Sequence, residues 1–266
     1  MVSVSIKKDS DLEEKLIGRD GKVNECRDLI LQDDRMSHLV EVLTRNEECQ
    51  IHAPPTNFSL DSYPDLDFIY SNEEINKFLS LKVAFEDNGY YNRNFGLLAS
   101  KMCQNLWNVE KKQIKLNPPK RVMYLGSFLR GNTQDEFELV VLGDASYFFG
   151  LGSVLTKFIV KGDLGNWGGA CMSYCEMHVQ GKLKDQVGDN SSSSEFHLYN
   201  ADVDKYWFAQ EMQDCSFYLY FNLLKAIHYK DNQAQYSYES RSLVGFEELK
   251  NFSHDKSFRV YNLGEK

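Results

Sequence analysis

The residues with the clearest potential for chemistry are a cysteine, a histidine and an aspartate in the second half of the chain. Cys171 follows a Gly-Gly-Ala segment, so it stands at the start of an element, where a thiolate can be stabilised. His197 can act as its base, and Asp214 can orient that histidine. This arrangement is compatible with a cysteine-dependent acyl-transfer enzyme, which is kept as an alternative. The competing interpretation is structural, because Cys171, Ser173 and Cys175 alternate like small side chains on one face of a strand.

Other residue types that could bind a ligand lack the spacing of known sites. His178 and His228 are each interpreted as hydrogen-bonded structural histidines, and the pair Cys171 and Cys175 has no second pair with which to hold a metal. The glycines of residues 162–169 match neither a phosphate-binding loop nor a dinucleotide fingerprint, which indicates a turn. The sequence therefore predicts no metal site and no required cofactor.

Charge and composition narrow the choice of partners. The 266 residues carry a formal net charge of −9, and 42% of them are hydrophobic, as in a globular protein. An acidic chain without a basic stripe is not expected to bind nucleic acid or an anionic membrane. The absence of a long apolar run and of a signal peptide predicts a cytoplasmic location. The six scattered cysteines are expected to be reduced thiols.

The N-terminal region predicts a charged helical arm over residues 1–50, followed by a single core domain over residues 51–266. Residues 22–45 place apolar side chains at near-helical spacing, which favours an amphipathic helix that docks on a neighbouring molecule. The pair Asp33 and Asp34 interrupts this pattern. Residues 38–44 also alternate as a strand would, so helix and strand both stay open there.

The rest of the chain predicts mainly β structure. Residues 79–86 alternate apolar and polar side chains, and the Asp-Asn-Gly sequence that follows predicts a tight hairpin. Residues 95–107 predict a helix, because Phe95, Leu98, Met102 and Leu106 recur at steps of three and four. Residues 207–227 are compatible with helix or strand.

Further strands are expected at residues 122–128, 137–142, 156–160 and 171–179, with Gly-Asn and Gly-Asp turns between them and a polar loop at residues 189–194. Short strands punctuated in this way predict an α+β, mainly β fold: an antiparallel, jelly-roll-like β-sandwich with accessory helices.

Four strings of the second half point to a known family. They are PPKRVMYLGSF (118–128), VVLGDASYF (140–148), KFIVKGDLGNWGGACMSYCEM (157–177), and QDCSFYLYF with IHY (213–221 and 227–229). In this succession the chain resembles the cypovirus polyhedrins, the matrix proteins of insect-virus occlusion bodies. The resemblance implies a β-sandwich, homotrimers packed in a crystalline lattice around virus particles in the cytoplasm of the infected cell, and an N-terminal helical arm that locks neighbours together. It also permits bound nucleotides, without placing them.

The resemblance implies a structural protein rather than an enzyme, and one that must dissolve in an alkaline gut. Free tyrosine ionises near pH ~10, so the chain's 15 tyrosines can supply the charge that separates contacts. The expected contributors are the clustered Tyr218, Tyr220, Tyr229, Tyr236 and Tyr238. Two alternatives stay open. One is an acyl-transfer enzyme of the glutamine deamidase or transglutaminase-like type that uses Cys171 and His197, and the other is a soluble interaction domain.

Overall fold

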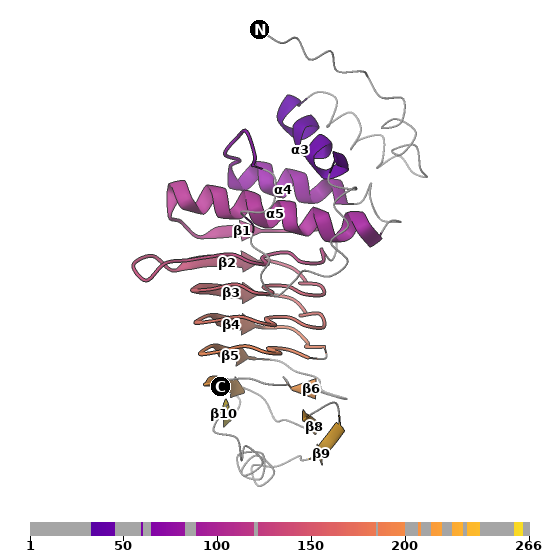
Figure 1. The fold of residues 1–266 in the computed structure, drawn as a ribbon, viewed down its shortest axis with the longest axis vertical. Helices are drawn as coiled ribbons and strands as arrows, with labels where there is room; N and C mark the ends of the chain where they lie inside the picture. The colour runs from indigo at the N-terminus through magenta and orange to yellow at the C-terminus, as the bar shows by residue number, and fades with distance from the viewer. Residues whose placement is uncertain are drawn as a thin grey trace.

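Most strands of the computed structural model form one parallel sheet beneath a layer of helices (Figure 1). The structure describes residues 33–45, 60, 65–82, 89–119, 122–184, 186–199, 207–208, 214–219, 225–230, 233–239 and 258–262. Seven strands pair in parallel in the order β1 (Ile114–Leu116), β2 (Phe137–Val141), β3 (Thr156–Val160), β4 (Glu176–Val179), β5 (Glu195–Leu198), β7 (Cys215–Leu219) and β10 (Phe258–Asn262). The expected antiparallel sandwich is therefore wrong.

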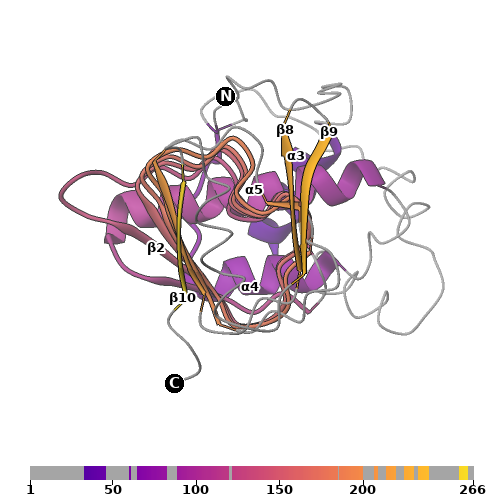
Figure 2. The same ribbon diagram turned by 90° about the horizontal axis from the view of Figure 1, so that it is seen from below.

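The chain reaches each parallel neighbour by coiling rather than by reversing. Lys157 of β3 lies beside Glu176 of β4, 19 residues further along the chain, and Glu176 lies in register with Glu195 of β5. We call each such turn of the coil a rung. Between the strands, bridges join successive rungs at two more positions, Ala145 to Leu164 to Leu183 and Val154 to Ser173 to Ser192. Seen along the stack, the rungs superimpose as a β-solenoid (Figure 2).

The interior of the solenoid is filled by columns of apolar side chains. Phe158, Met177 and Phe196 occupy equivalent positions of three strands, and all three are fully buried. The residues on either side of them, such as Lys157 and Glu176, are only partly buried and face outward. Apolar alternation thus identified the buried face of β2 and β3, which were both expected, but such alternation is the same in parallel and antiparallel strands.

The corners of the rungs depend on residues with positive φ and on close backbone contact. Phe148, Trp167 and Gln186 take φ values of 59°, 61° and 62° at equivalent positions. A Cβ added to Gly162 would lie 2.6 Å from the backbone carbonyl carbon of Gly143 and 2.7 Å from the backbone nitrogen of Asp144 in the preceding rung, so only glycine fits there. Gly-Asp pairs therefore turn the coil at a corner, where the sequence predicted turns between antiparallel strands.

Two of the described helices, α4 (Asn72–Ser80) and α5 (Gly89–Glu110), cover the first rung, and α3 (Asp34–Arg45) lies on their far side (Figure 1). The helix expected at residues 95–107 is confirmed and is longer, and it buries the predicted stripe, which includes Phe95 and Met102. The strand expected at residues 79–86 is wrong at its start, because Leu79 and Ser80 belong to α4. Residues 83–88 lie outside the described residues.

Amide side chains of the helices pair with the backbone of the first rung as another strand would. Asn72 of α4 donates to the carbonyl oxygen of Lys115 (2.8 Å) and accepts from its N–H (2.8 Å). Asn76 donates to the same carbonyl (2.9 Å) and accepts from the N–H of Asn117 (2.7 Å). Gln104 of α5 pairs in the same way with the N–H and C=O of Arg130 (2.7 and 3.0 Å). These amides cap the end of the solenoid.

The N-terminal region is described only from residue 33. Helix α3 is present within the expected range, and Asp33 begins it rather than interrupting it, because its carboxylate accepts from the N–H groups of Arg35 and Met36. Met36, Leu39 and Leu43 are buried against the rest of the chain. The arm proposed to act between molecules stays a prediction, since residues 1–32 lie outside the described residues. In the described part, no helix is long and apolar enough to cross a membrane.

The other expected β elements differ in detail. Residues 122–128 form a corner instead of a strand, and in the 171–179 segment only β4 is a strand, because Cys171 and Tyr174 both have positive φ. The predicted polar loop of residues 189–194 is a rung corner. Within residues 207–227, β6 (Trp207–Phe208) and β7 are strands. β6 pairs with β8 (Lys225–Lys230), which forms an antiparallel pair with β9 (Gln233–Glu239).

Candidate metal centre on the outer face of the sheet

Two adjacent strands place the same pair of side chains on the outer face of the solenoid. Strand β4 carries Glu176 and His178, and strand β5 carries Glu195 and His197, each pair separated by one inward residue. Residues two apart on a strand point to the same face, and in-register neighbours lie side by side. The sequence motif Glu-x-His, repeated after one rung, therefore becomes an array of two carboxylates and two imidazoles.

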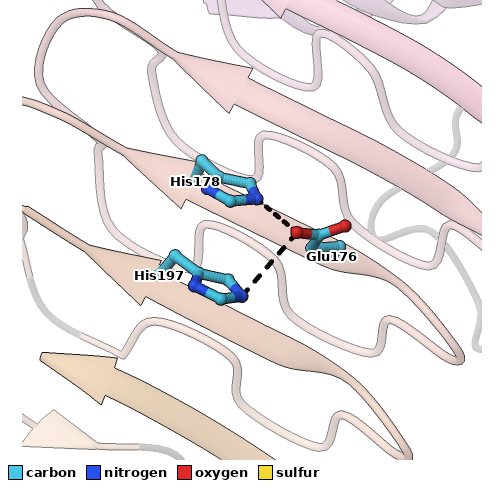
Figure 3. Close-up of side chains that lie close together, drawn as sticks. All are labelled: Glu176, His178 and His197. Carbon is cyan, nitrogen blue, oxygen red and sulfur yellow. Dashed lines mark hydrogen bonds and ion pairs between the residues drawn. The ribbon is translucent and has the colours of Figure 1, made fainter. Parts of the chain in front are cut away.

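The two imidazoles of this array converge on one carboxylate oxygen, Oε1 of Glu176 (Figure 3). The Oε1 atom of Glu176 lies 2.5 Å from the Nε2 atom of His178 and 3.7 Å from that of His197. All three ligand atoms lie within 4.8 Å of one another, as donors around one metal ion would. The side chains are 27%, 17% and 14% exposed, so the cluster is sheltered but reaches the surface.

The two histidines belong to an aromatic column that runs along the stack. The imidazole rings are parallel, with centroids 4.3 Å apart and an interplanar angle of 8°, and Tyr218 of β7 stacks on His197 at 4.5 Å. The Tyr199 hydroxyl lies 3.1 Å from the Nδ1 atom of His178. This contact leaves the opposite nitrogen of His178 directed at Glu176.

Charged neighbours set the protonation of the cluster. Burial alone would raise the pKa of Glu176, but hydrogen bonds from Lys157 and His178 outweigh burial and lower that pKa below its ordinary value. The Lys157 ammonium lies 2.9 Å from the Oε2 atom of Glu176. Burial also lowers the pKa of His197, and His178 lowers it further. At neutral pH the site therefore offers an ionised carboxylate and a neutral imidazole, the forms in which these groups bind metals.

The fold separates the residues of the predicted cysteine site. Cys171 stands at a corner of its rung, equivalent to Gly152 in the preceding rung and Asn190 in the following one. His197 instead lies on the sheet face, among Glu176, Glu195 and Tyr218. Desolvation of the Cys171 thiol and the nearby Asp189 carboxylate raise its pKa, which disfavours the thiolate. Cys171 is exposed and Cys175 is buried, so the predicted common strand face is wrong. Asp214 is exposed before β7.

The five tyrosines expected to control alkaline release lie in different places. Tyr218 is on β7 and stacks on His197. Tyr229 is on β8, and Tyr236 and Tyr238 are on β9. Tyr220 lies outside the described residues. Of the cysteines that the structure describes, Cys103, Cys171, Cys175 and Cys215 are not joined in disulfides.

In comparisons with protein-family models, curated proteins and solved structures, no match to this chain is found. The interpretation of the site therefore rests on its own geometry. The sequence prediction that no residues have metal-ligand spacing missed the cluster. Glu176 and His197 are 21 residues apart in the chain, and only the rung length shows that the fold brings them together. The signal that could have found it is the 19-residue recurrence of Glu-x-His, together with glycines at 143, 162 and 181.

Proposed function

We propose that this protein binds one divalent transition-metal ion, with Glu176, His178 and His197 as ligands. The observation that carries the proposal is the convergence of three ligand atoms from two strands within 4.8 Å. Two imidazoles with one carboxylate suit Zn²⁺, Ni²⁺, Cu²⁺ or Fe²⁺ better than Mg²⁺ or Ca²⁺, which prefer oxygen ligands throughout. Zn²⁺ is the appropriate first probe.

The distances in the cluster are close to those that a bound ion needs. With metal–ligand bonds of about 2.0–2.1 Å, donors around a tetrahedral Zn²⁺ lie about 3.3 Å apart. To bind one ion, the Oε1 atom of Glu176 and the Nε2 atom of His197, now 3.7 Å apart, must move slightly closer. The same oxygen and the Nε2 atom of His178, now 2.5 Å apart, must move slightly further apart. Because an imidazole binds through a lone pair in its ring plane, the two parallel rings must also tilt toward a common ion.

Neighbouring side chains support the ligands as an outer shell does in metal proteins. Metal-bound histidines usually donate their second N–H to an oxygen, and the Tyr199 hydroxyl is placed to accept from the Nδ1 atom of His178. Lys157 holds the other oxygen of Glu176, which leaves Oε1 for the ion. Replacing such outer partners typically costs about 10- to 100-fold in metal affinity.

The test is Zn²⁺ titration of the full chain by isothermal calorimetry, with bound zinc measured by mass spectrometry after dialysis. We expect one ion per chain, and at least a tenfold weaker affinity for Glu176→Gln and for His197→Gln, since each loses a ligand. Glu138→Gln, on the outer face of β2, and His38→Gln, in α3, are matched controls that should bind as the unaltered chain does. Equal binding by Glu176→Gln and by these controls would overturn the proposal.

Two functions expected from the sequence stay predictions. A crystalline occlusion-body matrix was implied by the polyhedrin resemblance, but the antiparallel sandwich implied with it is wrong, because the main sheet of the described residues is parallel. The acyl-transfer alternative requires Cys171 as a nucleophile, and its raised thiol pKa does not favour that role.

A further inference from the structure

We propose that Glu195 completes the metal site as a fourth ligand, so that the ion is a structural clasp between β4 and β5 rather than a catalytic centre. This inference rests on the proposed metal binding and adds to it. Structural zinc sites have four protein ligands, whereas catalytic sites keep one position for water. The number of protein ligands therefore decides what the ion does.

Glu195 is the one further carboxylate of the repeated Glu-x-His array. Its Oε2 atom lies 3.5 Å from the Nε2 atom of His197, close to the separation of two ligands on one ion. Glu195 is not among the three residues whose ligand atoms all lie within 4.8 Å of one another, so it must turn to reach the ion, and its side chain, 52% exposed, can do so without disturbing the core. The in-register neighbour of Glu195 is Glu176. Two carboxylates side by side repel each other, and a cation between them removes that repulsion.

The ligands come in equal numbers from two rungs. Glu176 and His178 lie on β4, and Glu195 and His197 lie on β5, so the ion would join strands that otherwise meet through backbone hydrogen bonds and stacking. Lys157 extends the same chain of contacts to β3 through Glu176. The clasp would thus connect three consecutive strands on one face.

A clasp at this position has a directional effect because a solenoid is held together by nearest-neighbour contacts. Its stability is a sum over rung interfaces, and the ends open first. The first rung is capped by α4 and α5, whereas β5 carries two of the proposed ligands and β7, which carries none, is stacked after it. β5 cannot separate from β4 without releasing the ion, so bound metal should suppress the opening of β5 and leave the capped end and the local opening of β7 unchanged.

Hydrogen exchange measured by mass spectrometry on the full chain, with and without Zn²⁺, tests this effect. At free zinc of about 100 times the dissociation constant, exchange that requires release of the ion should slow about 100-fold in peptides from β5. Peptides from α5 and β2 are the internal control. Bound zinc, shown by calorimetry, without added protection in β5 would overturn the clasp while leaving the proposed function intact.

The role of Glu195 is tested separately with Glu195→Gln, compared with Ser216→Ala on the next strand. We expect Glu195→Gln to weaken zinc binding at least tenfold with unchanged circular dichroism, and Ser216→Ala to have no effect. Unchanged affinity of Glu195→Gln would overturn the inference, and zinc-dependent hydrolysis of p-nitrophenyl acetate by the unaltered chain would show an open catalytic site in its place. Absence of zinc binding to the unaltered chain would instead defeat the proposed function, and the clasp with it.

Discussion

Asp33 stabilises the start of α3 through two kinds of contact. Its carboxylate accepts hydrogen bonds from the backbone N–H groups of Arg35 and Met36, and it forms an ion pair with Lys77 of α4 at 2.7 Å. The Lys77 hydrogen bond, helped by those backbone bonds, lowers the pKa of Asp33 below its ordinary 3.8, although burial opposes this. A single carboxylate thus links two helices of the cap.

This pKa shift predicts an acid-sensitive cap. A carboxyl whose pKa is lower when folded stabilises the fold above its unfolded pKa, and that contribution is lost as pH falls through the folded pKa. Asp33→Asn should therefore lower the melting temperature at pH 6, by an amount equivalent to less than about 1 kcal/mol for a partly exposed pair. The difference from the unaltered chain should shrink toward pH 2 in thermal scans.

Asp34→Asn is the matched control, because it removes the same charge from the adjacent, exposed position. Its effect on the melting temperature should be smaller than that of Asp33→Asn at pH 6. A difference between Asp33→Asn and the unaltered chain that stays constant from pH 6 to pH 2 would contradict this explanation.

At the scale of the elements, the cap protects an edge strand. β1 pairs with β2 on one side, and its other side would present unpaired N–H and C=O groups that invite association with another chain. Asn72 and Asn76 occupy these groups. Asn72 and Asn76 are four residues apart in α4, so both amides lie on the same face of the helix, the face that contacts β1.

Removing both amides should expose the β1 edge. We expect Asn72→Ala/Asn76→Ala to lower the free energy of unfolding by about 1–3 kcal/mol, since four hydrogen bonds are exchanged for bonds to water. We also expect concentration-dependent dimers in analytical ultracentrifugation. Asn108→Ala, which removes the exposed amide that contacts Gln104, is the control and should stay as stable and as monomeric as the unaltered chain. A monomeric, fully stable double variant would refute the capping role.

The elements that the sequence predicts correctly are those with a periodic pattern of apolar residues along the chain. The stripe of Phe95, Leu98 and Met102 predicts α5, and the alternation of residues 156–160 predicts β3, because burial on one face leaves a periodic pattern. The direction of neighbouring strands leaves no such pattern. The apolar residues 122–128 were mistaken for a strand because a buried corner is as apolar as a strand.

The candidate site was missed from the sequence for a related reason. Neither Glu176-x-His178 nor Glu195-x-His197 is distinctive alone, and their meeting depends on a rung of 19 residues that aligns them. Gly143, Gly162 and Gly181 are spaced by this same length in the sequence, but only a search for internal repeats reveals it. Once the repeat is recognised, the positions of both histidines follow.

At the scale of the whole molecule, the equivalence of successive rungs makes the length of the protein adjustable. Residues 157–175 constitute one rung, and a copy inserted after Cys175 would again place a lysine beside Glu176 and a phenylalanine beside Met177. Three added copies should lengthen the folded molecule by about 14 Å, at about 4.8 Å per strand spacing. Small-angle scattering would measure this increase, and zinc affinity should be unchanged.

Inserts one residue shorter provide the control. An 18-residue copy shifts the register by one, which turns Phe158-type side chains outward and lysines into the core. Such a chain should fail to fold cooperatively, whereas whole-rung inserts should remain soluble and monomeric. If both kinds of insert behaved alike, the rungs would not be interchangeable units.

The corner geometry that permits these inserts has a consequence for how such a gene can change. A duplication or loss in multiples of 57 base pairs, the coding length of 19 residues, alters the protein by whole rungs. The helical cap and the Glu-x-His array would each survive intact, while the distance between them changed in fixed steps. Descendants of this chain could then differ in the length of the solenoid without any substitution in the helical cap or in the Glu-x-His array.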